Sequence, residues 1–332
     1  MSIATVPFTG RLPVRRLAAF ALAVAASAPS LAQQYPNKPV RLLVTAAAGG
    51  ITDIMARIVA EPVSRNLGQP LIVENRPGAG GNIAVGMTAK SPSDGYTIVI
   101  VNVGSAAIVR WISKDLGFDP MTDVVGVAPV GEVPSIAAIP DSLPAKTLLE
   151  FIDYARANPG KVNYGSAGTA TMPHLAAVML GNMTGTTMVH VPYKGGGPAA
   201  VDLAAGRIQL GLLGIGSLQA QFASGQVRPL AVAAKQRLVA LPAVPTFDEA
   251  GVPGYDVTNW FGIQAPKGTP REVLHTINSS FGRAFDNPAV VQRFTDAGIL
   301  PMRESVDDFQ KRIASDDAKW REVVKSAGIK AD

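Results

Sequence analysis

The stretch LGQPLIVENRPGAGGN, residues 67–82, predicts a buried strand, a glycine-rich loop and the start of a helix. The strand is Leu71–Glu74, and the glycines that follow it allow a tight turn. The first N–H groups of a helix have no partner within it and carry partial positive charge, which suits an anionic ligand. Glycines also form turns that bind nothing, so the rest of the chain must decide between these two interpretations.

The composition is that of a globular protein. The chain has 332 residues, of which 47% are hydrophobic and 17% charged, and this length is enough for two domains. It contains no cysteine, which excludes disulfides, thiolate metal sites and cysteine nucleophiles. The three histidines, His174, His190 and His275, lack the HExxH spacing of zinc enzymes, and we expect neither a metal nor a cofactor.

Residues 1–32 have the pattern of a secretory signal peptide. Three arginines, at 11, 15 and 16, precede a short apolar segment, LAAFALAVAASA (17–28), and small residues precede Gln33. The alternative is an uncleaved membrane anchor, for which the apolar segment is short. Without a cysteine there is no lipid attachment at the cleavage site. We therefore expect a soluble exported protein that is not lipidated.

The charge of the mature chain is close to neutral. The full sequence carries 30 basic and 25 acidic residues, a formal charge of +5. Removal of 1–32 takes away three arginines and no acidic residue, which leaves 27 basic against 25 acidic residues, or +2. Nucleic-acid binding needs a clustered basic face, so we expect no nucleic-acid partner.

Short β-branched segments alternate with helical segments, which is typical of an α/β fold with mostly parallel sheets. The expected strands are Val40–Val44, Leu71–Glu74, Thr97–Val103, Ile136–Ile139, Val162–Tyr164, Thr187–Val191, Ile208–Leu213, Leu230–Ala233 and Val257–Gln264. Helix starts are expected at a capping box over Thr147–Glu150, at a cap on Thr269, at Asn287-Pro288 and at Ser305.

No low-complexity linker divides the chain, so two domains would have to be joined by strands that cross between them. We expect crossings near 130–134 and 255–259. Domain 1 is then 33–132 together with 257–332, domain 2 is 133–256, and the ligand cleft lies between them.

Three loops each follow an expected strand and open an expected helix. They are TAAAGGITD (45–53), NRPGAGG (75–81) and SAGTATMPH (166–174). Ligands of open α/β sheets bind beyond the carboxyl ends of the strands, where such loops meet. Backbone N–H groups and Ser or Thr hydroxyls can hold a carboxylate there without an arginine. Any one of these loops could be an ordinary turn, but the first and third together favour a ligand site.

Several side chains near these loops are explained by structural roles rather than by ligand contacts. We expect Asp53 to cap a helix rather than to contact a ligand amine, His174 to begin a helix, and His190 to be a buried strand residue. The motif GxSxG is absent around Ser105 and Ser166, and no histidine is placed by the sequence to activate either serine. We therefore expect no enzyme; the alternative is an exported α/β hydrolase or transferase that acts on a small carboxylate.

The chain resembles a known family, the Bug-type periplasmic receptors of the tripartite tricarboxylate transporter system. The resemblance covers essentially the whole mature chain. It rests on YPNKPVRLLV (35–44), GGITDIMAR (49–57), LGQPLIVENRPGAGGNIA (67–84), SPSDGYTI (91–98), LPAKTLLEFIDYARANPGKVNYGSAG (143–168), HVPYKGGGPA (190–199), LPAVPTFDEAGVPGYDVTNWFGIQAPKGTP (241–270) and VVKSAGIK (323–330).

The resemblance implies a two-lobed, type II periplasmic-binding-protein (Venus flytrap) fold. It implies a receptor that captures a small organic carboxylate and presents it to membrane permease subunits; we expect a monomer. Carried onto this sequence, the ligand-binding residues are Ala48, Gly49, Gly50, Thr52, Asp53, Ser166, Gly168, Thr169 and Thr171, with Ser105 from the facing edge of the cleft.

Two departures from the family pattern bear on specificity. Ala46, Ala47 and Ala48 stand where the family usually has prolines and often an aromatic residue. Leu213-Gly214 stands where the family often has an Asp-Asn pair. An apolar position disfavours a cationic ligand group, so we expect a carboxylate with an apolar or aromatic body rather than an amino acid.

Overall fold

The computed structural model describes residues 1, 4–5 and 35–329, and the chain separates into two units, Met1–Asn37 and Lys38–Asp332. The predicted signal peptide, 1–32, lies outside the described residues apart from positions 1, 4 and 5. Among the described residues, no helix is both long enough and apolar enough to cross a membrane. The second unit contains the fold described below.

Helices and strands alternate through the second unit, and each strand expected from the sequence overlaps an observed one. The strands are β1 Val40–Val44, β2 Leu71–Asn75, β3 Thr97–Asn102, β4 Val124–Pro140, β5 Val162–Ser166, β6 Met188–Pro192, β7 Leu210–Gly214, β8 Val227–Val232, β9 Thr258–Pro266 and β10 Leu300–Pro301. The helices are α2 Ile51–Leu67, α3 Asn82–Ala89, α4 Val109–Ile112, α5 Leu148–Ala157, α6 Met172–Thr184, α7 Gly196–Ala204, α8 Ile215–Ala223, α9 Arg271–Ala284, α10 Pro288–Asp296 and α11 Val306–Ser326, with a 3-10 turn η1 at Ala79–Gly81 and a π turn η2 at Gly104–Ile108.

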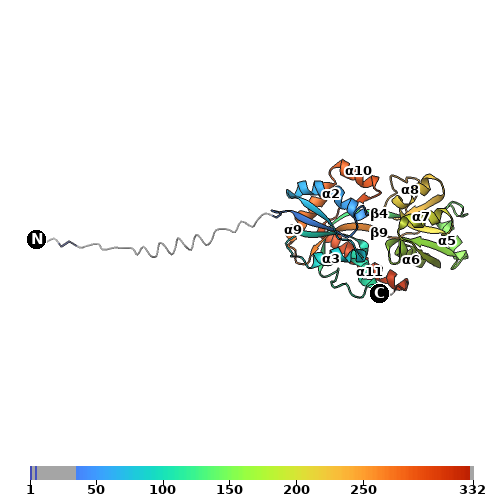
Figure 1. Ribbon diagram of the computed structural model, residues 1–332, viewed down its shortest axis with the longest axis horizontal. Helices are drawn as coiled ribbons and strands as arrows, with labels where there is room; N and C mark the ends of the chain where they lie inside the picture. Colours follow the sequence, from blue (N-terminus) through green and yellow to red (C-terminus); the bar gives the residue numbers. More distant parts are fainter. Residues whose placement is uncertain (2–3, 6–34, 330–332) are drawn as a thin grey trace. The chain divides into compact units, whose positions relative to one another are not determined.

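Each lobe contains three parallel strands. In the first lobe β2, β1 and β3 are parallel, and β3 joins β9 antiparallel. In the second lobe β6, β5 and β7 are parallel, and β7 joins β4 antiparallel. Figure 1 shows α2, α3, α9 and α10 on one side of the β4 and β9 labels and α5 to α8 on the other. The expected two-lobed α/β fold is therefore confirmed.

Strand β4 belongs to both lobes. Its residues 124–134 pair antiparallel with β9, and from Ser135 onward it pairs with β7 and β8. Strands β1 to β3 run in the same direction as β4, because two antiparallel steps separate β3 from it. Strands β5 to β7 run against β4. The carboxyl ends of both parallel sets therefore point toward the change of partners at Pro134 and Ser135, and toward each other.

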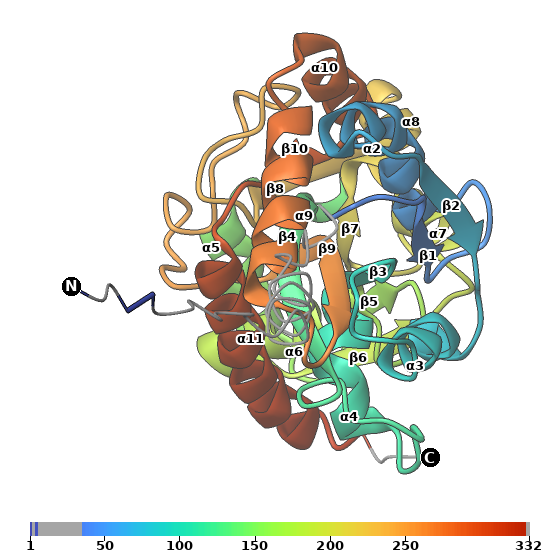
Figure 2. The same ribbon diagram turned by 90° about the vertical axis from the view of Figure 1, so that its left-hand side faces the viewer.

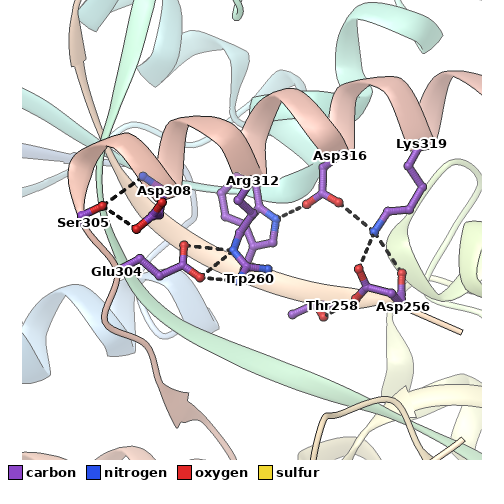
Figure 3. Close-up of polar contacts among 9 residues, drawn as sticks. All are labelled: Asp256, Thr258, Trp260, Glu304, Ser305, Asp308, Arg312, Asp316 and Lys319. Carbon is purple, nitrogen blue, oxygen red and sulfur yellow. Dashed lines mark hydrogen bonds and ion pairs between the residues drawn. The ribbon is translucent and has the colours of Figure 1, made fainter. Parts of the chain in front are cut away.

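Helix α11 holds the two crossing strands in place, and Figure 2 shows it running beside β9 and β4. Trp260 of β9 is fully buried, and its indole N–H donates to Asp316 Oδ2 at 2.5 Å. The carboxylate of Asp316 also pairs with Lys319 at 2.7 Å, and Lys319 donates to the backbone carbonyl of Asp256 at 3.0 Å. Figure 3 shows this chain of contacts reaching from α11 to the segment that enters β9.

Most expected helix starts are confirmed. Thr147 accepts from the N–H of Glu150, Asn287 from that of Ala289, and Ser305 from that of Asp308. The expected cap on Thr269 is wrong. The capping position before α9 is Pro270, whose φ of −55° and ψ of 141° are extended, and Thr269 donates its hydroxyl to Pro266 O instead. Proline is at the cap itself, so α9 begins one residue later than expected.

The close packing of α11 on β9 predicts the effect of adding one methyl group at Gly262. A Cβ there would collide with Phe309 Cζ and lie 2.9 Å from Ala128 O. We expect Gly262→Ala to lower the free energy of unfolding by about 1–3 kcal/mol through overpacking. Urea denaturation followed by circular dichroism measures this change.

The matched control is Gly282→Ala within α9, where no atom lies within 4 Å of the new Cβ. Here we expect a gain of about 0.5–1 kcal/mol, because alanine is the better helix former. Equal effects of the two substitutions would contradict the packing of α11 described above.

Candidate ligand-binding site

Asp53 orders the first loop from the first turn of α2. It is 3% exposed, and its Oδ2 accepts the N–H of Gly49 at 2.9 Å. Its carboxylate also receives Arg57 Nε at 2.9 Å and Asn75 Nδ2 at 2.8 Å. Burial alone would raise the pKa of this carboxyl group, but hydrogen bonds from Arg57, Gly49 and Asn75 hold the pKa below its ordinary value. The expected N-cap role is wrong: the cap is Gly50, and Asp53 is the third helical residue, which reaches back to the loop.

The second loop ties the first loop to the sheet. Asn75, at the end of β2, donates both to Asp53 and to Ala46 O, the latter at 3.0 Å. Gly81 has φ +103°, and a Cβ there would lie 2.9 Å from Thr45 Cβ and 3.2 Å from Ser105 Cβ. Only glycine fits this close approach. The stretch 67–82 thus brings the first loop and Ser105 together.

Ser105 is buried in η2, after β3, and is 1% exposed. Its N–H donates to Asn102 Oδ1 at 3.0 Å, and its hydroxyl donates to Asn102 O at 3.2 Å. These bonds fix the turn at the end of β3.

In the third loop, Ser166 occupies a supporting position. Ser166 is fully buried; its hydroxyl donates to Gly168 O at 2.9 Å and accepts the Gly168 N–H at 3.1 Å. Thr171 caps α6 by position, and its hydroxyl also donates to Gly168 O, at 2.7 Å. Thr169 is exposed, and among the described residues its hydroxyl and N–H have no recorded partner.

Two histidines pack behind the third loop. His174 of α6 and His190 of β6 are stacked, with ring centroids 3.7 Å apart and planes 5° apart. His174 Nδ1 accepts the N–H of Ala170 at 3.0 Å, and His190 Nε2 lies 2.6 Å from Ser166 Oγ. Burial lowers the pKa of His174 to about 4, with a smaller contribution from His190, and burial also lowers the pKa of His190. His190 is only half-buried, so the expectation of a buried strand residue is wrong.

The facing loops leave backbone donors free at the starts of two helices. In α2 the N–H groups of Ile51 and Thr52 have no acceptor among the described residues, and the same holds for Met172 and His174 in α6. Gly49 and Gly50 use their N–H groups inside the loop, on Asp53 and Ala47 O. Free N–H groups at helix starts, next to the hydroxyl of Thr169, suit an anion.

Sequence reasoning missed the contact between His190 and Ser166, because the two residues meet only through the pairing of β5 with β6. Tyr164 pairs with His190 and Ser166 with Pro192 in that ladder. Ser166 is fully buried and its hydroxyl is engaged by the loop backbone, which is the arrangement of a structural serine rather than an exposed nucleophile.

Other features lie away from these loops. Leu213 is buried in the core of the second lobe, among Ile136, Leu203 and their neighbours, so its side chain packs rather than facing the strand end. A cavity of about 570 Å³ is lined by the start of α5, by β8 and by residues 243–251, and another of about 330 Å³ by residues 302–305 and α9. Neither cavity includes a residue of the three loops.

Solved structures similar to this chain share its fold over most of its length. R. palustris Rpa4515 with adipate is 35% identical, with a TM-score of 0.74, over 90% of this chain and 100% of that one. MatC from Rhodopseudomonas palustris, with bound malate, is 30% identical, with a TM-score of 0.70, over 87% and 100%. The periplasmic binding protein BugD is 31% identical, with a TM-score of 0.70, over 90% and 100%. The fold is that of the two-lobed periplasmic solute-binding receptors.

Family membership follows from the sequence comparisons. The family model of the tripartite tricarboxylate transporter family receptor matches residues 55–329. Protein BugT of Bordetella pertussis is 33% identical over 305 residues, which cover 92% of this chain and 94% of that protein. The chain belongs to the tripartite tricarboxylate transporter receptor family.

Removal of the Asp53 carboxylate should loosen the first loop. Asp53→Ala leaves the Gly49 N–H and the Arg57 and Asn75 side chains without this acceptor. We expect the free energy of unfolding at pH 7 to fall by about 1–3 kcal/mol, measured by urea denaturation. Because the pKa of Asp53 is lowered, this contribution is complete above the unfolded pKa of about 4 and is lost as the pH falls through the folded value.

Asp153→Ala is the control, since Asp153 forms an exposed surface pair with Arg156 at 3.4 Å. We expect a change within about 0.5 kcal/mol there. An Asp53→Ala protein as stable as the wild type would show that the first loop does not depend on this carboxylate.

Proposed function

We propose that this chain is a periplasmic receptor that captures a small organic carboxylate and presents it to the permease subunits of a tripartite tricarboxylate transporter. The observation that carries the proposal is the pair of facing helix starts, α2 and α6, whose free N–H groups belong to opposite lobes. Relatives with 35% and 30% identity, solved with adipate and with malate, support the carboxylate class.

The proposed domains are 33–132 with 257–332, and 133–256, with the ligand between them. The change of partners of β4 between Pro134 and Ser135 supports the first boundary. The entry of the chain into β9 after Asp256 supports the second. Closure is then a hinge motion about these two crossings, and the ligand favours the closed state because it binds both lobes only there.

Within this site the predicted residues divide into two roles. Asp53, Ser105, Ser166, Gly168 and Thr171 order the loops, since each is bonded to the loop backbone or to a neighbouring turn, and the N–H groups of Gly49 and Gly50 are used in the same way. The residues proposed to meet the ligand are Ala48 and Thr52 from the first lobe and Thr169 from the second. Ala47 and Ala48 are exposed and carry no polar group, which supports a ligand with an apolar or aromatic body rather than an amino acid.

Export and assembly complete the proposal. Residues 1–32 act as a cleaved signal peptide without lipid attachment, and the mature receptor is a monomer. The alternative, an exported α/β hydrolase or transferase, has one supporting observation in the contact between Ser166 and His190 at 2.6 Å. The burial of Ser166 argues against it.

Thr169→Ala tests the third loop. Its hydroxyl is exposed beside the free N–H groups of α6, so its loss should weaken carboxylate binding by about 1–2 kcal/mol through one charge-assisted hydrogen bond. Isothermal titration calorimetry with adipate measures the effect. Thr295→Ala, on the exposed face of α10, should leave the affinity unchanged. Equal affinities of wild type and Thr169→Ala would mean that the loop is only a turn.

A thermal-shift panel of carboxylates tests the ligand class. A ligand at 100 times its dissociation constant stabilises the protein by about 2.7 kcal/mol. We expect shifts with aliphatic or aromatic carboxylates and none with glutamate or aspartate; tight binding of the amino acids alone would overturn the proposed specificity. Recovery of the bound compound unchanged after incubation distinguishes a receptor from the hydrolase or transferase.

A further inference from the structure

The third loop is held by a contact that only a neutral imidazole can make. Ala170 has φ +60°, a left-handed backbone that costs a non-glycine residue about 1–2 kcal/mol. Its N–H is directed at His174 Nδ1, 3.0 Å away, so this nitrogen must carry a lone pair and His174 must be protonated only on Nε2. A proton on Nδ1 would place two donors against each other and remove the bond that holds Ala170.

The second imidazole supports the other end of the loop. Ser166 Oγ donates to Gly168 O and accepts from Gly168 N–H, so its contact with His190 Nε2 is satisfied when that nitrogen donates. The two rings lie 3.7 Å apart and nearly parallel, a stack in which two imidazolium charges would repel each other at close range.

The surroundings provide no charge that would offset protonation. From β5 the facing titratable group is Tyr164, stacked on both rings at 6.1 and 5.1 Å, and burial raises its pKa to about 12, so it stays neutral. From α6 and β6 the facing groups are the two histidines themselves. Tyr193, the next titratable residue after β6, donates instead to Asp202 on α7. Among the described residues no carboxylate is recorded in contact with either ring.

We propose that the His174–His190 stack is an acid-sensitive positioning element, which holds the loop 167–171 in its ordered form only while both rings are neutral. In acid His174 takes up a proton on Nδ1 and its contact with Ala170 is lost, a charge on His190 repels that charge across the stack, and the loop relaxes. The lowered pKa values agree with this direction, because the ordered loop then binds fewer protons than the relaxed one between pH about 6.5 and about 4. The consequence for ligand release rests on the proposed function; the ordering of the loop does not.

Hydrogen exchange without any ligand tests the ordering. We expect the protection factors of the bonded loop amides, Gly168, Ala170 and Thr171, corrected for intrinsic exchange, to fall by up to about tenfold per pH unit for each proton taken up between pH 6.5 and 4. Residues 45–53 of the first lobe contain no histidine and serve as the internal control. Loop protection that is unchanged from pH 7 to pH 4 would overturn the proposal.

A double variant, His174→Asn with His190→Gln, keeps the hydrogen bonds and removes the titration. The asparagine amide oxygen can replace Nδ1 as the acceptor, and the glutamine amide N–H can replace Nε2 as the donor. We expect protection of the loop that does not change with pH. His275→Gln, at the third histidine, which is exposed on α9, should keep the wild-type pH dependence. A double variant with the same acid response as the wild type would also overturn the proposal.

If the double variant does not fold, NMR of the wild type still decides the question. Its three imidazole Cε1–H signals can be followed with pH beside the amide signals of the loop. The proposal requires the loop amides to shift with the two stacked histidines, and it fails if they follow only His275 or none of the three. Adipate, used as the probe, should lose more affinity between pH 7 and 5 in the wild type than in the variant; failure of adipate and of every other carboxylate in the panel to bind would contradict the proposed function alone.

Discussion

The antiparallel pairing of β4 with β9 is the constraint on which the rest of the structure depends. Residues 124–134 of β4 pair with β9 in one lobe, and the same strand pairs with β7 in the other from Ser135 onward. This one change of partners fixes the direction of every parallel strand relative to the crossing. The loops at the carboxyl ends of β1 and β5 therefore face each other, and the proposed site lies between these loops.

Helix α11 fixes the position of the crossing strands. Asp316 is 6% exposed and is paired with both the Trp260 indole and Lys319, so none of these polar groups is buried without a partner. A buried ion pair of this kind adds little net stability over apolar packing, but removal of one member costs several kcal/mol. Its effect is to hold the segment at Asp256, where the chain enters β9, in one position against the first lobe.

The sequence predicted the strands and most helix starts, because these depend on neighbouring residues in the chain. Strands are set by β-branched segments, and the caps at Thr147, Asn287 and Ser305 by a single side chain that accepts from a backbone N–H three or fewer residues away. Contacts across the sheet could not be predicted in this way. The meeting of His190 with Ser166 depends on the register of β5 and β6, and the reach of Asp53 back to Gly49 depends on which residue begins α2.

The stretch 67–82 identifies the family more strongly than it contributes to the proposed ligand contacts. Asn75 and Gly81 shape the first loop through Asp53, Ala46 and Thr45, so their side chains are committed to the protein itself. The same holds for Ser166 and the two stacked histidines in the other lobe. A residue whose side chain is needed for these internal contacts cannot be replaced to suit a new ligand without loosening a loop. Ligand specificity must therefore reside in positions whose side chains make no such internal contacts. In this chain these positions are the exposed alanines at 47 and 48 and the exposed Thr169.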